Sequence, residues 1–131
     1  MYEISEEEFE MAIENAVDAI PSKFLDQMEN ICIVAEDEPR PEDFATIRNP
    51  KYPTGTKRRG ELLGLYHGVN ITRRSEYYQM VEPDMITIFK GPHERVCNSY
   101  EQIITQIAKT VIHEIGHYFG LDDDRLHEIG Y

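Results

Sequence analysis

Hydrophobic residues recur at helical spacing in two stretches of the chain, one near each end. In the N-terminal stretch, apolar side chains repeat three or four residues apart, at Phe9, Ala12, Ile13, Ala16, Val17 and Ile20. Ser5 followed by Glu8 forms a capping box, which predicts the start of a helix. Pro21 predicts its end or a bend, and a short helical piece is expected within residues 23–30.

The C-terminal stretch is longer and predicts the main helix of the protein. Asn98 and Ser99 each precede a Glu or Gln by three residues, which gives two overlapping capping boxes. We expect the helix to run to about Phe119 and to stop at Gly120, because glycine readily takes the left-handed conformation that ends a helix. Its apolar side must face the core and consists of Ile103, Ile104, Ile107, Ala108, Val111, Ile112, Ile115, Tyr118 and Phe119.

Three shorter apolar runs predict strands. Residues 31–35 are largely β-branched, and we expect a strand that is buried on both faces. Residues 61–67 predict a second strand, and residues 85–89 a third, which Gly91-Pro92 should stop. Between the first two strands, residues 36–60 are charged and contain four prolines, so they predict a long loop.

These elements predict one α+β domain over residues 1–131. A small sheet of three to four strands should pack against the N-terminal helix and against the long C-terminal helix. No internal repeat and no low-complexity tract divides the chain. A length of 131 residues suits a single hydrophobic core.

The charge and the cysteines restrict the function further. The net charge of −12 argues against nucleic acid as a partner, since nucleic-acid binding needs a basic surface, and against attachment to an anionic membrane. No apolar run approaches the roughly 18–20 residues of a membrane span, and the acidic N-terminus does not resemble a signal peptide. Cys32 and Cys97 are too few for a disulfide framework. We therefore expect a reduced, cytoplasmic protein.

The most specific chemical signal is the segment His113-Glu114-Ile115-Gly116-His117. On a helix, residues i and i+4 project from one face about 6 Å apart along the axis. Two imidazoles at this spacing can bind one zinc ion, each at about 2.0–2.1 Å. Glu114 can then serve as general base toward a water molecule that the metal activates, which is the chemistry of the H-E-x-x-H pattern.

Both histidines fall on the stripe of the helix opposite to its apolar side, together with Gln102, Gln106 and Thr110. Glu114 falls on the border, where burial of a carboxylate costs free energy unless solvent, a hydrogen bond or a cation compensates it. The alternative interpretation is two solvated histidines on an exposed helix face. The carboxylate between them and the acids downstream favour the metal site.

A catalytic zinc site needs a third protein ligand. Asp123 is the best candidate, because it completes the spacing H-x-x-x-H-x-x-G-x-x-D, a metzincin-type pattern with Asp in place of the third His. The acids 122–124 also follow a helix C-terminus, where a divalent cation would relieve their repulsion with the macrodipole. His127 and Glu128 compete as ligands if a final helical turn forms, and one of the acids can instead cap that turn.

The chain resembles the bacterial minimal zincin-like metallopeptidase family over most of its length. The resemblance rests on three segments, of which the last is the specific one: Glu61–Gly68, Ile86–Pro92 and Val111–Leu126. It implies a small α+β fold with a metal site on the long helix. It also implies that His113 and His117 are metal ligands, that Glu114 is the general base, and that Asp123 is the acid of the motif.

The predicted function is zinc-dependent hydrolysis of a peptide or protein substrate, with Zn²⁺ as the cofactor. The alternatives are a metal-binding regulatory or interaction module with little peptidase activity, and a zinc hydrolase that acts on a non-peptide bond. An open edge on the strand at 85–89 would bind a peptide by strand addition. The residues that can stabilise the oxyanion are Tyr66, His67, Arg125 and Tyr131.

Basic residues cluster at Lys57-Arg58-Arg59, with Arg73-Arg74 further along. The favoured interpretation is a solvated loop that balances a very acidic surface. The alternative is a site that recognises an acidic partner or substrate. The pattern does not predict an oligomeric state.

Overall fold

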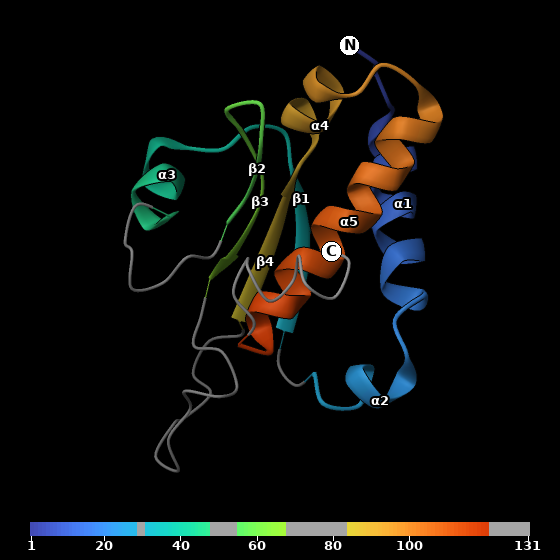
Figure 1. Cartoon of the computed structure of the whole chain (residues 1–131), viewed down its shortest axis with the longest axis vertical. Coiled ribbons are helices and arrows are strands. Elements are labelled where there is room, and N and C mark those ends of the chain that lie inside the picture. Colours follow the sequence, from blue (N-terminus) through green and yellow to red (C-terminus); the bar gives the residue numbers. More distant parts are fainter. Residues whose placement is uncertain (29–30, 48–54, 68–83, 121–131) are drawn as a thin grey trace.

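A computed structural model of the chain describes residues 1–28, 31–47, 55–67 and 84–120 (Figure 1). In chain order the elements are α1 (Glu6–Asp18), α2 (Ser22–Leu25), β1 (Ile31–Glu36), α3 (Pro41–Ile47), β2 (Gly55–Arg58), β3 (Glu61–His67), β4 (Asp84–Phe89), α4 (Lys90–Val96) and α5 (Tyr100–Tyr118). The fold is α+β, as predicted: a four-stranded sheet is covered on one face by α1 and α5.

The strands lie in the order β1-β4-β3-β2, so β1 and β2 form the two edges of the sheet as described. β1 runs parallel to β4, whereas β3 is antiparallel to both β4 and β2. β4 pairs on both sides, so it has no open edge at which a peptide could add as a further strand. The prediction that residues 31–35 are buried on both faces was wrong, because every residue of β1 is half-buried. An apolar run does not tell an edge strand from a central one.

The ends of the two long helices follow the predicted caps. The Ser5 side chain accepts a hydrogen bond from the backbone N–H of Glu8 at 3.1 Å, and α1 ends before Pro21. Ser99 caps α5 in the same way by accepting from the backbone N–H of Gln102 at 3.2 Å. After α5, Gly120 has φ +85°, which is the left-handed conformation expected there.

The main core lies between the sheet and the two long helices. α5 contributes Ile103, Ile107, Val111, Ile115 and Tyr118, α1 contributes Phe9, Ala12, Ile13 and Ala16, and the sheet contributes Leu63, Tyr66, Ile86 and Ile88. A smaller cluster on the other face of the sheet joins Leu62, Leu65 and Phe89 to Phe44 of α3. This packing fixes the position of α5 against β3 and β4.

The segment 36–60, predicted as a loop, contains a helix and a strand. Pro41 is the first residue of α3, a position that favours proline because its missing N–H has no partner in the helix anyway. The Asp43 carboxylate accepts a hydrogen bond from the backbone N–H of Arg40 at 2.8 Å and so ties the start of this helix. α4 was missed for the same reason, since Pro92 stands in its first turn. Proline predicts an interruption of a helix, whereas at these two positions it belongs to the beginning of one.

β2 and β3 form a hairpin whose turn is Arg59-Gly60. Both residues have positive φ, +51° and +78°, as a two-residue hairpin turn requires. The cluster Lys57-Arg58-Arg59 lies at this turn. Its side chains are exposed, which agrees with the favoured interpretation of a solvated surface, although Arg58 also donates to Gln106 of α5 at 2.8 Å. Arg73 and Arg74 lie outside the described residues.

Cys32 and Cys97 are both free thiols. Cys97 is buried, and this burial raises the pKa of its thiol. Within the described ranges, no helix is long and apolar enough to cross a membrane.

Candidate metal centre

The long helix α5 brings His113, Glu114 and His117 to one place. The two imidazole rings lie with centroids 4.9 Å apart and planes at 76°. The three residues are 6%, 0% and 4% exposed, respectively. The alternative of two solvated histidines on an exposed helix face is therefore wrong. A buried pair of imidazoles beside a carboxylate is a suitable set of donors for a divalent metal ion.

The hairpin of β2 and β3 covers the middle of the stripe of α5 that lies away from the apolar core. Thr110 on this stripe is fully buried, and Gln106 is half-buried. The sequence pattern marked the stripe as polar, but a polar stripe is buried when a second element packs on it. At Gln106, Thr110 and Glu114, α5 is therefore covered on a second side by the hairpin.

Glu114 is held from the side of β2. The Thr56 hydroxyl donates a hydrogen bond to Glu114 Oε2. Thr56 pairs with Gly64 across the hairpin, so the contact places this carboxylate beneath the edge of the sheet. The Thr56 hydroxyl, a neutral donor, thus offsets part of the free-energy cost of burying the Glu114 carboxylate.

Gly64 permits the close approach of β3 to α5. A Cβ atom at this position would lie 2.6 Å from Thr110 Cγ2 and 3.2 Å from Glu114 Cγ. The register of the hairpin changes from Thr56↔Gly64 to Lys57↔Leu62, which makes Leu63 the extra residue of a β-bulge. The bulge and the glycine together let the helix lie directly on the strand at Glu114.

His93 of α4 supports α5 through a contact with Thr110. Its ring is fully buried, Nδ1 donates to the Phe89 carbonyl at 2.7 Å, and Nε2 lies 3.0 Å from Thr110 Oγ1. Burial lowers the pKa of His93 to about 4, so the ring is neutral at pH 7. A neutral ring that donates through Nδ1 accepts through Nε2. His93 therefore fixes Thr110, one helical turn before Glu114.

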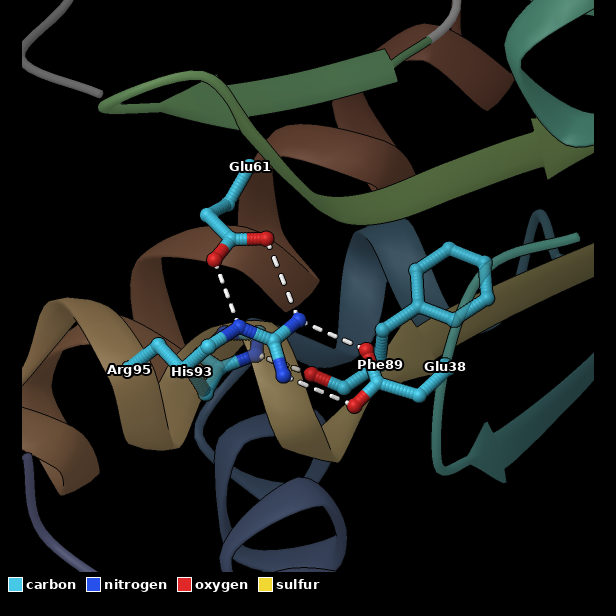
Figure 2. A network of polar contacts seen from close by, with 5 residues as sticks. All are labelled: Glu38, Glu61, Phe89, His93 and Arg95. Carbon is cyan, nitrogen blue, oxygen red and sulfur yellow. Dashed lines mark hydrogen bonds and ion pairs between the residues drawn. The ribbon is translucent and has the colours of Figure 1, made fainter. Parts of the chain in front are cut away.

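Figure 2 shows His93 and Phe89 beside a second polar network, which joins α4 to the start of β3. Arg95 donates to Glu61 Oε2 at 2.5 Å and to both oxygens of Glu38, at 2.6 and 2.8 Å. The hydrogen bonds from Arg95 lower the pKa of the Glu38 carboxyl. Glu38 in turn covers Gly91, where an added Cβ atom would collide with Glu38 Oε2. The network fastens α4, and therefore His93, to the sheet.

The predicted third ligand lies outside the described residues. Asp123 and its competitors His127 and Glu128 all follow Gly120, the last residue described before the C-terminus. Within the described ranges, no group of three or more His, Cys, Asp or Glu side chains is arranged to hold a metal ion. The structure therefore assembles the two histidines and the glutamate of the motif and does not test the remaining ligand.

Of the four residues proposed to stabilise the oxyanion, two lie within the described ranges and two lie outside them. The Tyr66 hydroxyl is buried and donates to Asp84 Oδ2 at 2.9 Å. His67, at the end of β3, is more accessible, and its Nε2 lies 3.8 Å from Asp43 Oδ1. Arg125 and Tyr131 lie outside the described residues.

Three supporting residues were missed from the sequence: Thr56, Gly64 and His93. Thr56 falls in the segment that was predicted as a loop, and a lone histidine such as His93 carries no motif. Gly64 did carry a signal, since a glycine inside a strand often marks a bulge or a close approach of another element. That signal does not identify the element that approaches.

A solved structure supports the fold. The chain is similar to a conserved hypothetical protein from Thermus thermophilus, with a TM-score of 0.55 and 18% sequence identity, over 88% of this chain and 94% of that one. At this identity the likeness concerns the fold alone. No protein with a curated description matches the chain.

The family comparison covers more. A family model described as a zincin-like metallopeptidase matches residues 28–131. The match includes the whole sheet, α4 and all of α5 with its buried His113, Glu114 and His117. Since it spans most of the chain, the resemblance seen in the sequence is confirmed, and the chain belongs to the zincin-like metallopeptidase family.

Proposed function

We propose that the protein is a zinc-dependent peptidase whose reaction takes place at His113, Glu114 and His117. The observation that carries the proposal is the burial of these three side chains together on one helix, with the imidazole rings 4.9 Å apart. Burial of three ionisable side chains costs free energy. Membership of a metallopeptidase family gives this cost a functional reason.

We propose that His113, His117 and Asp123 would hold the metal. The described donors fit this role, because neutral imidazole is a good ligand for Zn²⁺ and a carboxylate can complete the set. When bound, a zinc ion lowers the pKa of water and polarises the carbonyl of the substrate. His127 and Glu128 remain the competing third ligands.

Glu114 would act as general base and then as general acid. It would accept a proton from the attacking water and deliver it to the leaving amine of the cleaved peptide bond. The hydrogen bond from Thr56 restricts the orientation of the Glu114 carboxylate. Such restriction favours catalysis, because a proton acceptor acts only within hydrogen-bond reach of its target.

The substrate would lie along β2. This strand is an edge of the sheet as described, and its Thr56 contacts Glu114. An extended peptide that pairs with an edge strand gains main-chain hydrogen bonds. β4, the strand first considered for this purpose, is paired on both sides. Of the two described candidates for stabilising the oxyanion, His67 is the better one, since the Tyr66 hydroxyl already donates to Asp84.

The proposed location is the cytoplasm, in agreement with the two free cysteines. The partner is a peptide or protein, and the net charge of −12 makes nucleic acid and an anionic membrane unfavourable partners.

Glu114→Gln is the direct test of the reaction. We expect zinc-loaded wild type to cleave members of a broad peptide library, and Glu114→Gln to lose this activity while retaining zinc. Glu101→Gln is the matched control, because Glu101 is an exposed residue in the first turn of the same helix. Unchanged cleavage by Glu114→Gln would refute the mechanism. Zinc binding without cleavage in the wild type would instead favour a metal-binding regulatory module.

A further inference from the structure

A groove lies on the surface between α1 and α5, outside the metal centre. Figure 1 shows these two helices side by side on one face of the sheet. The groove has a volume of about 440 Å³, and its lining from the two helices includes Met11, Ala12, Ala16, Tyr100, Ile104 and Ala108. The three described residues of the candidate metal centre are not among these side chains, so the groove is a separate feature.

The groove is formed by the spacing of small and large residues on the two helices. Ala12 and Ala16 of α1 stand one turn apart and are buried, so they provide a shallow apolar floor. Tyr100, Ile104 and Ala108 of α5 line the other side at intervals of four residues. At about 1.5 Å per residue, the lining of α5 extends over about 12 Å, or two turns of a helix.

Two large apolar side chains beside this floor are exposed. Met11 is 56% exposed and Tyr100 is 52% exposed. The Tyr100 ring packs edge-on against Tyr2, with centroids 6.3 Å apart, which limits its freedom. A rigid aromatic residue beside an apolar groove loses little conformational entropy when a partner covers it, as in a typical binding hot spot.

The charge around the groove selects the partner. Glu7 and Glu8 are the charged residues of the lining. The sequence of α1 contains six acidic residues and no basic one. A membrane surface with anionic lipids would be repelled here, and so would a second copy of a chain with a net charge of −12.

We propose that the groove between α1 and α5 binds an amphipathic helix with basic residues from a partner protein. Two or three large apolar side chains, spaced three or four residues apart on the partner, would fill the groove between Met11 and Tyr100. Lysine or arginine at the borders of that apolar stripe would pair with Glu7 and Glu8. The site would recruit a substrate or a regulator without contact with the metal centre.

The probe is a fluorescein-labelled helical peptide of about five turns, with Leu at positions i, i+3, i+4 and i+7 and Lys on the polar face. The control peptide carries Glu in place of every Lys. Fluorescence anisotropy should give saturable binding of the Lys peptide and binding of the Glu peptide that is weaker by about tenfold or more. Met11→Ala and Tyr100→Ala should each weaken binding of the Lys peptide by about tenfold. Both residues are exposed, so the fold should tolerate these substitutions.

A charge pair provides the matched control. Glu7 and Glu10 are both exposed on α1, but Glu7 alone of the two lines the groove. Glu7→Lys should weaken binding of the Lys peptide more than Glu10→Lys does. Equal effects of the two variants, or binding that persists in Met11→Ala and Tyr100→Ala, would mean non-specific attraction to an acidic protein and would overturn the proposal.

The remaining outcomes are equally decisive. Self-association of the wild type that Tyr100→Ala abolishes, measured by sedimentation, would assign the groove to a second copy and overturn the proposal. Glu114→Gln should bind the Lys peptide as tightly as the wild type. This variant separates the two hypotheses, because it should lose peptidase activity without a change in peptide binding at the groove. Absence of binding at the groove would likewise not contradict the proposed peptidase activity.

Discussion

Acidification should destabilise the protein through His93. The ring is fully buried, lies edge-on to Phe9 and contacts the Phe89 carbonyl and Thr110 Oγ1. It offers little space for the hydration of a charge. Burial therefore lowers its pKa from 6.5 to about 4. In the unfolded chain the same imidazole is solvated and titrates near its ordinary pKa.

The size and sign of the effect follow from this difference in pKa. Between pH 6.5 and about pH 4 the unfolded state binds a proton that the folded state excludes. The free energy of unfolding therefore falls as the pH falls below 6.5, and the loss is complete near pH 4. At 1.36 kcal/mol for each pKa unit, the full loss is about 3 kcal/mol. This is a large part of the stability of an ordinary small domain.

Urea unfolding between about pH 7 and pH 4.5 measures this loss. We expect the free energy of unfolding of the wild type to fall over this range, and that of His93→Gln to fall less, because glutamine does not titrate. His67→Gln is the control, since the His67 side chain is 38% exposed. Glu38, whose pKa is lowered by Arg95, adds a loss at more acidic pH in all three proteins. Equal slopes for wild type and His93→Gln would refute the reasoning.

Two further substitutions test the support of Glu114. Gly64→Ala should lower the free energy of unfolding by about 1–3 kcal/mol, because the new methyl group would lie 2.6 Å from Thr110 Cγ2; unchanged stability in urea would contradict this packing. Thr56→Val should lower kcat for peptide cleavage by about tenfold with zinc content unchanged, since the donor to Glu114 is lost. Thr56→Ser should retain most of the activity, and a Thr56→Val enzyme as active as the wild type would exclude a positioning role.

The sequence predicted those parts of the fold that local chemistry determines. Ser5, Ser99 and Gly120 act on the backbone of their own helices, so their roles can be derived without knowledge of the tertiary structure. The fold class was predicted correctly because the hydrophobic patterns of the individual helices and strands are local signals as well. Proline was the exception, because Pro41 at the start of α3 and Pro92 in the first turn of α4 have the opposite meaning from a proline inside a helix.

The features that were missed depend on which elements meet in space. The position of β1 at an edge depends on its pairing with β4, more than 50 residues away along the chain. The burial of Thr110 and Glu114 depends on the hairpin of β2 and β3, which packs on α5. The spacing of the motif predicts His113, Glu114 and His117 as candidate site residues, whereas the side chains that contact Glu114 and Thr110 could be found only from the structure.

Zinc content is the measurement that tests the central claim most directly. The protein should be purified without added metal and compared with His117→Ala and Glu114→Gln by elemental analysis. We expect about one zinc per chain in the wild type and in Glu114→Gln, and its loss in His117→Ala, because two neighbouring imidazoles are required to hold the ion. Equal zinc in the wild type and His117→Ala would contradict the assignment of a metal centre to α5.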